Sequence, residues 1–306
     1  MATVAAHPMQ GFPVRPLKFT IDELSEEDFL WSPHRPELAV FLNALGVHVP
    51  YFERYLVHSM RQARERITDP ELRRDATAII GQEAHHAHNF LKLNARLAER
   101  YPRMPEFEAT NKHYFEGAAG RDSLKRLTGF TAGYETFTFL AGAIILQNHP
   151  RWLADAQPVM NALWVWHQVE EVEHGAVAID VYRHLYGDHE WYRKWMVLVA
   201  LTHIFRETFA AYFHMVRVEG WLRRPRRALR SVGFFLYLGG VFLKNALPAF
   251  RRGYDPRRHP LVTDGQSPIQ IAWRHYAAAG GNVLAIDRDK MAEILGVARY
   301  GDPADG

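Results

Sequence analysis

The spacing of apolar residues along the chain predicts helices almost throughout. Apolar side chains recur every three or four residues over long stretches, as on one face of an α-helix, and the alternation of a half-buried strand is scarce. Prolines and capping residues divide this pattern, because proline fits the first helical turn and breaks a helix interior. We therefore expect an all-α protein, with helices over 36–47, 50–67, 70–100, 106–117, 120–148, 156–186, 190–219, 227–246, 268–278 and 287–297.

Three regions of the chain differ in character. Residues 1–35 contain several prolines and no helical period, which predicts an irregular N-terminal arm. Residues 36–220 contain most of the long helical segments, and we expect them to form a helix bundle that holds the functional site. Residues 221–306 are predicted to form a basic helical extension that packs on this bundle.

Composition restricts the classes of protein and of site. The 306 residues suffice for a large core, and the 48% apolar and 23% charged content is that of a soluble globular protein. Because the chain contains no cysteine, disulfides, thiolate zinc sites, iron–sulfur clusters and cysteine nucleophiles are excluded. Any metal must therefore be held by His, Asp or Glu. The N-terminus lacks a signal-peptide pattern, so a cytoplasmic location is expected.

Positive charge is concentrated in one C-terminal segment. Residues 217–258 contain eleven Lys and Arg but only two acidic residues. The apolar run 232–243 within this segment is shorter than the ~20 residues of a bilayer span, and charged residues near the middle of 195–216 argue against a span there. Peripheral association of 221–258 with an anionic membrane is one interpretation, and plain packing on the bundle is the other. No nucleic-acid partner is expected, since no recognition motif accompanies the charge.

Two pairs of glutamates are placed symmetrically about predicted helix breaks. Glu53 and Glu83 lie 30 residues apart, and the break at 68–70 is midway between them. Two antiparallel helices joined at that midpoint place both residues at the same height. Glu135 and Glu171 lie 36 residues apart around the next long break, so the same geometry applies.

The second helix of each hairpin adds a histidine three residues after its glutamate. Glu83 with His86 and Glu171 with His174 both form Glu-x-x-His, and residues three apart share one helix face. One glutamate from each of two helices, with Glu-x-x-His from each of two others, is the ligand set of ferritin-like di-iron and di-manganese bundles. We therefore predict a ferritin-like four-helix bundle with additional C-terminal helices. Its dinuclear metal site would be formed by Glu53, Glu83, His86, Glu135, Glu171 and His174.

A third histidine lies on the same face as the second motif. His167 precedes Glu171 by four residues, so His167, Glu171 and His174 lie within about 60° of one another around the helix. We expect His167 to bind the same metal as Glu135, and a core histidine is the alternative. Glu83 and Glu171 are the expected bridging ligands. Other ionisable residues of the motifs face away and are expected at the surface or behind the ligands, namely His85, His88, Glu170 and Glu173.

Three sequence blocks carry a family resemblance. The blocks at 49–55 (VPYFERY), 81–86 (GQEAHH) and 166–174 (WHQVEEVEH), the last extended by 177–182, resemble those of a bacterial family described as predicted metal-dependent hydrolases. This likeness covers roughly residues 30–260. The spacing His-x-x-x-Glu-x-x-His in the third block is also similar to that of di-iron arylamine oxygenases, in which such an extra histidine binds iron.

The resemblance implies a function but leaves the reaction open. The ligand pattern implies two iron ions, with manganese or a mixed pair as alternatives, O₂ as co-substrate, an external electron donor and a small aromatic or amine-bearing substrate. The family description implies hydrolysis by a metal-activated water instead. We expect O₂-dependent oxidation, with hydrolysis as the alternative and a homodimer as one possible assembly. Iron storage is disfavoured by the length of the chain.

Several residues near the predicted ligands are candidates for a substrate pocket. Four of them surround Glu135 on its helix, and two others lie on a later helix, from which they would reach the metal cavity. For all six, ordinary core packing is the alternative, and for the last two an internal ion pair within the core. The candidates are Thr131, Tyr134, Thr138, Phe139, His203 and Glu207.

Overall fold

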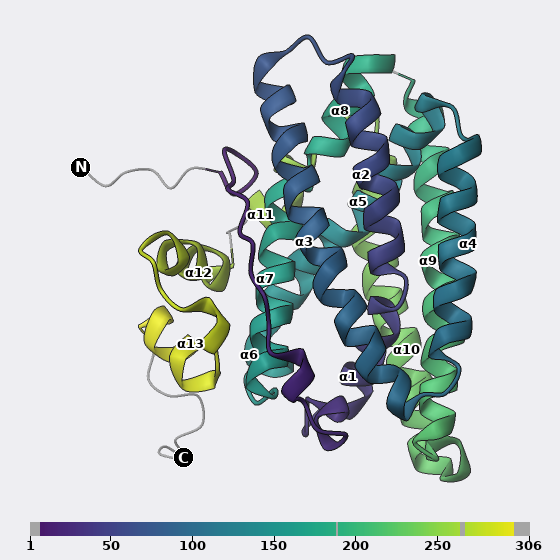
Figure 1. The fold of residues 1–306 in the computed structure, drawn as a ribbon, viewed down its shortest axis with the longest axis vertical. Helices are drawn as coiled ribbons and strands as arrows, with labels where there is room; N and C mark the ends of the chain where they lie inside the picture. Colours follow the sequence, from purple (N-terminus) through teal and green to yellow (C-terminus); the bar gives the residue numbers. More distant parts are fainter. Residues whose placement is uncertain (1–6, 188, 264–266, 297–306) are drawn as a thin grey trace.

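The computed structural model describes residues 7–187, 189–263 and 267–296, which form helices without any strand (Figure 1). The all-α class predicted from the sequence is therefore confirmed. The predicted helices 36–47, 70–100, 190–219 and 268–278 begin and end within two residues of the observed ones. Residues 1–6 of the predicted arm and residue 297 of the last predicted helix lie outside the described residues.

Two helical hairpins form the centre of the molecule. The first joins α2 (Val49–Arg64) to α3 (Pro70–Arg100), and the Asp69 side chain caps α3 by accepting hydrogen bonds from two backbone N–H groups of its first turn. The second joins α5 (Leu124–Gln147) to α7 (Pro158–His174) through the short α6 (His149–Trp152). In addition, α2 packs against α5 and α3 packs against α7, so the four helices surround one interior. The ferritin-like description of this arrangement stays a prediction.

Further helices cover the hairpins. They are α1 (Pro36–Gly46), α4 (Met104–Arg121), α8 (Val177–Tyr186), α9 (Glu190–Val218), α10 (Pro225–Ala246), α11 (Pro260–Thr263), α12 (Pro268–Ala278) and α13 (Arg288–Leu295). A long helix, α9, lies along α5 and α1, and α10 packs against α5 and α1. The smaller α12 contacts α5 and α7, beside the N-terminal arm that runs along the outside of α3 and α7 (Figure 1). The division of the chain at residues 35 and 220 stays a prediction.

Short 3₁₀ helices complete the described chain. Two of them, η1 (Ile21–Glu23) and η2 (Glu27–Leu30), interrupt the otherwise irregular arm. The arm is anchored by buried apolar side chains, including Phe12 and Phe19. The other four are η3 (Trp221–Arg223), η4 (Leu247–Phe250), η5 (Pro256–Arg258) and η6 (Val283–Ala285).

The helix predicted over 156–186 is wrong as a single element. The structure ends α7 at His174 and starts α8 at Val177. At the break, the backbone of Gly175 lies against Phe139, where an added Cβ would come within 2.8 Å of the Phe139 side chain. Glycine permits this close approach directly after the Glu-x-x-His motif.

A second close approach joins α5 to α9. A Cβ added to Gly133 would lie 2.5 Å from the backbone oxygen of Met196. We expect Gly133→Ala to lower the free energy of unfolding by about 1–3 kcal/mol, because the helices must separate. Gly120→Ala is the matched control, since a Cβ added there meets nothing within 4 Å. Alanine there should stabilise α4 by about 0.5–1 kcal/mol. Chemical denaturation measures both changes, and equal effects would contradict the packing argument.

In the part of the chain that the structure describes, three helices are long and apolar enough, by length and composition alone, to cross a membrane. They are α5, α9, and α10 continued by η4 over Pro225–Phe250. The apolar window of α5 is 94% buried inside the protein, whereas those of α9 and α10 are 44% and 22% buried. From the sequence alone the run 232–243 is too short to span a bilayer. The helix that contains this run is longer than the run itself, because it begins at Pro225 and continues into η4, and it is a candidate span by length and composition alone.

Candidate metal centre

Seven ionisable side chains from four helices meet in the interior. Glu53 comes from α2, Glu83 and His86 from α3, and Glu135 from α5, while α7 contributes the other three. Each of the seven is at most 4% exposed. The two hairpins therefore place their predicted ligands at the same height in the bundle. The structure brings together Glu53, Glu83, His86, Glu135, His167, Glu171 and His174.

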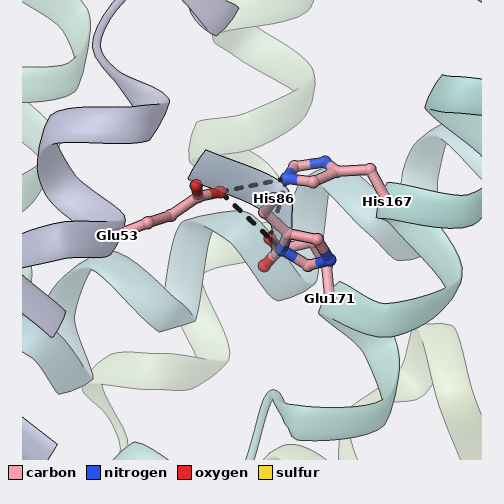
Figure 2. A group of neighbouring side chains, drawn as sticks. All are labelled: Glu53, His86, His167 and Glu171. Carbon is pink, nitrogen blue, oxygen red and sulfur yellow. Dashed lines mark hydrogen bonds and ion pairs between the residues drawn. The ribbon is translucent and has the colours of Figure 1, made fainter. Parts of the chain in front are cut away.

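One end of this cluster consists of Glu53, His86, His167 and Glu171, whose ligand atoms lie within 4.8 Å of one another (Figure 2). The Nε2 atom of His167 lies 3.4 Å from Glu53 Oε1 and 3.1 Å from Glu171 Oε1. His86 Nδ1 lies 3.7 Å from the same two oxygens. The expectation that His167 joins the Glu135 end is therefore wrong. A helical wheel gives the direction in which the His167 side chain points, whereas the height of His167 along the bundle places it beside Glu53.

The other end consists of Glu83, His86, Glu171 and His174, which also lie within 4.8 Å of one another. His174 Nε2 is 3.1 Å from Glu83 Oε1, and His174 Nδ1 is 2.7 Å from Glu135 Oε2. His86 and Glu171 belong to both ends. This sharing fits the predicted bridging role of Glu171.

The donor atoms fit divalent cations. Buried polar atoms normally have hydrogen-bond partners, yet among the described residues six possible ligand atoms of this cluster make no well-aligned hydrogen bond and have at most ion-pair contacts within the cluster. Carboxylate oxygens and imidazole nitrogens suit iron, manganese and zinc. The buried His and Glu groups can thus hold metal. The six atoms are Glu53 Oε2, Glu83 Oε1 and Oε2, His86 Nδ1, Glu171 Oε2 and His174 Nε2.

Protons balance the charge of these groups in the metal-free protein. Burial, together with the charges of Glu83 and Glu171, raises the pKa of Glu53 well above its usual range. Burial also raises the pKa of Glu135 to about 8, although His174 opposes the shift. For His174, burial lowers the pKa, but the surrounding carboxylates raise it further, to about 10. Metal ions would take over the role of these protons, since both neutralise the crowded carboxylates.

His86 is oriented from behind by Glu170, which the sequence analysis placed either at the surface or behind the ligands. Its Nε2 lies 3.0 Å from Glu170 Oε2, which leaves Nδ1 directed into the cluster. A carboxylate hydrogen-bonded to the outer nitrogen of a ligand histidine fixes the tautomer and the ring orientation. Glu170 and Glu173 are both fully buried. Of the two alternatives expected from the sequence, the surface position is therefore wrong, and the position behind the predicted ligands is the one observed.

The N-terminal arm completes this outer layer. Arg15 donates to Glu170 at 2.9 Å and binds Glu173 through two hydrogen bonds of 2.8 Å. Arg274 lies 2.9 Å from Glu173 as well. Sequence spacing gave no signal for Arg15, because the arm has no helical period.

His167 has its own orienting neighbour, Gln168. The Gln168 side-chain nitrogen lies 2.9 Å from His167 Nδ1, while the Gln168 side-chain oxygen has no partner. Metal binding through His167 Nε2 requires a proton on Nδ1. The Gln168 side chain would then turn its oxygen toward that proton, so the His167 N–H and the Gln168 oxygen would each have a hydrogen-bond partner.

An apolar cavity of 380 Å³ reaches this centre. Glu53, His167 and Glu171 line its inner end, among mainly apolar walls. Of the predicted pocket residues, Tyr134 and Thr138 line the cavity, and the Thr138 hydroxyl also donates to Glu135.

Four predicted pocket residues lie off the cavity, each for a separate reason. Thr131 is buried in the core, and Phe139 packs against His259 with 5.6 Å between ring centroids. His203 stacks on Tyr114 and binds the Tyr134 hydroxyl at 2.5 Å. Glu207 accepts hydrogen bonds from the buried Asn111 and from Arg206, whose side chain is exposed, so the expected ion pair forms but is not internal.

His48 lines the cavity and was not anticipated as a site residue. It immediately precedes α2, is 3% exposed, and its Nδ1 has no hydrogen-bond partner among the described residues. Burial lowers the pKa of His48 to about 3, so its ring is neutral at pH 7. The only sequence signal is its position before Pro50, since the residue belongs to no motif.

Comparison with known proteins identifies the family. A family model described as "Predicted metal-dependent hydrolase" matches residues 13–260. The chain belongs to this family. The match includes Arg15, all seven clustered residues and α10, so the family region extends beyond the four central helices. No curated protein and no solved structure shows a significant match. The family resemblance is therefore confirmed, whereas no comparison supports the likeness to arylamine oxygenases.

Proposed function

We propose that this predicted metal-dependent hydrolase uses a dinuclear metal centre to hydrolyse an apolar small molecule bound in the cavity. One observation carries the proposal: the cavity ends on Glu53, His167 and Glu171, which also belong to the metal-binding cluster. A molecule that fills the cavity would therefore place its innermost group beside the metals. The family description supports hydrolysis.

The residues divide into those that hold metal and those that receive substrate. Glu53, His86 and His167 would bind one ion, Glu83, His174 and Glu135 the other, and Glu171 both. Bound divalent cations supply a Lewis acid and lower the pKa of water. The apolar walls exclude bulk water and favour an apolar substrate.

His48 is proposed to orient the substrate. Its neutral ring lies in the mainly apolar cavity wall and carries a buried Nδ1 acceptor that has no hydrogen-bond partner among the described residues. His48→Phe should lower kcat/KM by about 10-fold to 100-fold, with metal content unchanged, because a buried hydrogen bond to substrate is lost. His149→Phe is the matched control. His149 is another fully buried histidine with a lowered pKa, but it lies off the cavity. Equal losses in both variants would contradict the assignment.

A second candidate function is O₂-dependent oxidation by two iron ions, with an external electron donor. The observation that favours it is the donor set, since four glutamates and three histidines in a buried cluster suit iron as well as zinc. Manganese or a mixed pair would fit the same donors. The aromatic or amine-bearing substrate belongs to this candidate.

The two reactions can be separated by metal and oxygen. The protein is reconstituted with Zn²⁺ under argon, or with Fe²⁺ in air, and assayed with p-nitrophenyl esters of increasing chain length. Hydrolysis predicts Zn²⁺-dependent turnover without O₂, faster for octanoate than for acetate. O₂ uptake with a reductant, only in the iron form and without ester cleavage, would support oxidation and overturn hydrolysis. The Glu53→Ala variant should be inactive in either assay.

A further inference from the structure

Helices α9 and α10 expose an unusually apolar surface. On α9, Trp195, Leu198, Phe205 and Phe209 are all exposed and recur every three to seven residues along one side of the helix. On α10, Leu236 and Leu243 are 63% and 52% exposed. We call this surface the α9–α10 face. A continuous exposed apolar surface of this kind marks an interaction site.

The two stripes of this face lie side by side. Phe205 and Phe209 pack against Phe235 of α10, with 5.3 and 5.6 Å between ring centroids. Phe205 and Leu243 also line the same cavity. The face is therefore one surface formed by two helices.

Basic residues flank this face. Residues 220–254 contain eight Lys and Arg and no acidic residue. Arg223, Arg224 and Arg226 precede or begin α10, and Arg251 follows η4, all of them exposed. An apolar helix face with basic residues at its ends is the pattern of helices that lie on anionic membranes. A second copy of the chain is a poorer occupant, because it would bring like charges together.

The orientation follows from the packing and the charges. The inner side of α10 is covered by α5 and α1, so this helix cannot be surrounded by lipid. The exposed Arg206 lies near the middle of α9, where a span would bury its charge in hydrocarbon. Both observations favour a face that rests on the membrane surface.

The cavity opens on this same face. Its outer lining includes Thr202 and Phe205 of α9 and Gly239 and Leu243 of α10. Phe205 and Leu243 are about half exposed, so the cavity reaches the surface between them. Its inner end is the Glu53 side of the metal cluster.

We propose that the α9–α10 face rests on an anionic bilayer and that the substrate enters the cavity directly from the lipid, between Phe205 and Leu243. The substrate is then amphipathic and lipid-soluble, with an apolar chain against the cavity wall and its reactive group at the metals. The substrate class rests on the proposed function, whereas membrane attachment does not.

Vesicle flotation tests the attachment. The full-length protein should float with phosphatidylglycerol vesicles and at least about ten-fold less with phosphatidylcholine vesicles, because the arginines meet no anionic headgroups there. Leu236→Glu should lower binding to phosphatidylglycerol by about ten-fold or more, since one leucine no longer enters the apolar layer. Leu284→Glu, at an exposed leucine on η6, is the matched control and should bind normally.

Uptake of a fluorescent fatty acid tests the route. Parinaric acid delivered in phosphatidylglycerol vesicles should bind the wild-type protein. A Cβ at Gly239 would lie 3.9 Å from the Phe205 ring, so Gly239→Phe should fill the opening. This variant should lose fatty-acid binding by about ten-fold while it still floats and keeps its metal. The Glu53→Ala variant should float normally, so failure of the metal chemistry leaves the attachment test intact.

Three results would overturn the proposal. The first is a wild-type protein that does not float with anionic vesicles. The second is a soluble dimer that Leu236→Glu converts to a monomer, because the face would then be an interface between two copies. The third is unchanged fatty-acid uptake in Gly239→Phe, which would refute the route between α9 and α10.

Discussion

The Glu171→Gln variant is expected to lose both metal ions. Glu171 is the carboxylate shared by the two ends of the cluster, so its replacement removes a ligand from each. His174 and His167 hold the pKa of Glu171 at about 2 against the opposing effect of burial, which keeps the side chain ionised for metal binding. Glutamine has the same shape but no charge. Metal affinity should fall by about 100-fold or more, since outer partners of metal ligands already contribute 10–100-fold.

Metal analysis of the purified variant after dialysis measures this loss. Glu116→Gln, at an exposed glutamate of α4, is the control and should retain the wild-type metal content. A Glu171→Gln protein that keeps two metals per chain would refute the dinuclear assignment. Retention of one metal would show that the two ends bind independently.

Replacement of Arg15 is expected to weaken both the fold and the metal centre. Arg15 compensates two fully buried carboxylates, Glu170 and Glu173, through three hydrogen bonds. Removal of one partner from a buried ion pair costs about 3–5 kcal/mol. Without Arg15, Glu170 would no longer be held against His86, so metal affinity should also fall by about 10–100-fold.

Urea denaturation and metal titration of Arg15→Ala measure the two effects. Lys18→Ala, three residues along the same arm and exposed, should leave both unchanged. Arg15→Lys should recover only part of the loss, because an ammonium group cannot make the paired hydrogen bonds of a guanidinium. If Arg15→Ala is less stable but keeps full metal affinity, the second effect is contradicted. Arg15 would then support the fold without orienting His86.

Sequence spacing predicted the centre well because its positions lie on regular helices. A Glu-x-x-His run fixes a shared helix face, and a break midway between two glutamates fixes a shared height. These two rules predict Glu53 level with Glu83 and Glu135 level with Glu171 without any knowledge of packing, and the structure brings all four side chains into one cluster. That the cluster binds metal stays a proposal.

The failures have equally definite causes. His167 was assigned to the wrong end because a helical wheel gives the direction of a side chain and not which partner lies across the bundle. At the break between α7 and α8, Gly175 leaves room for Phe139, which is 36 residues away in sequence. Arg15 lies in an irregular segment, where no period indicates what a side chain faces.

The contact between Arg15 and Glu170 spans 155 residues of sequence. The arm is synthesised first, yet its partners exist only after α7 has formed. Contacts of such high sequence separation form late in folding, because a long loop must close before they stabilise the chain. During that interval Glu170 lacks the guanidinium of Arg15, and the contact between Glu170 and the His86 ring is unsupported. Synthesis from the N-terminus therefore produces Arg15 long before the two carboxylates that it compensates.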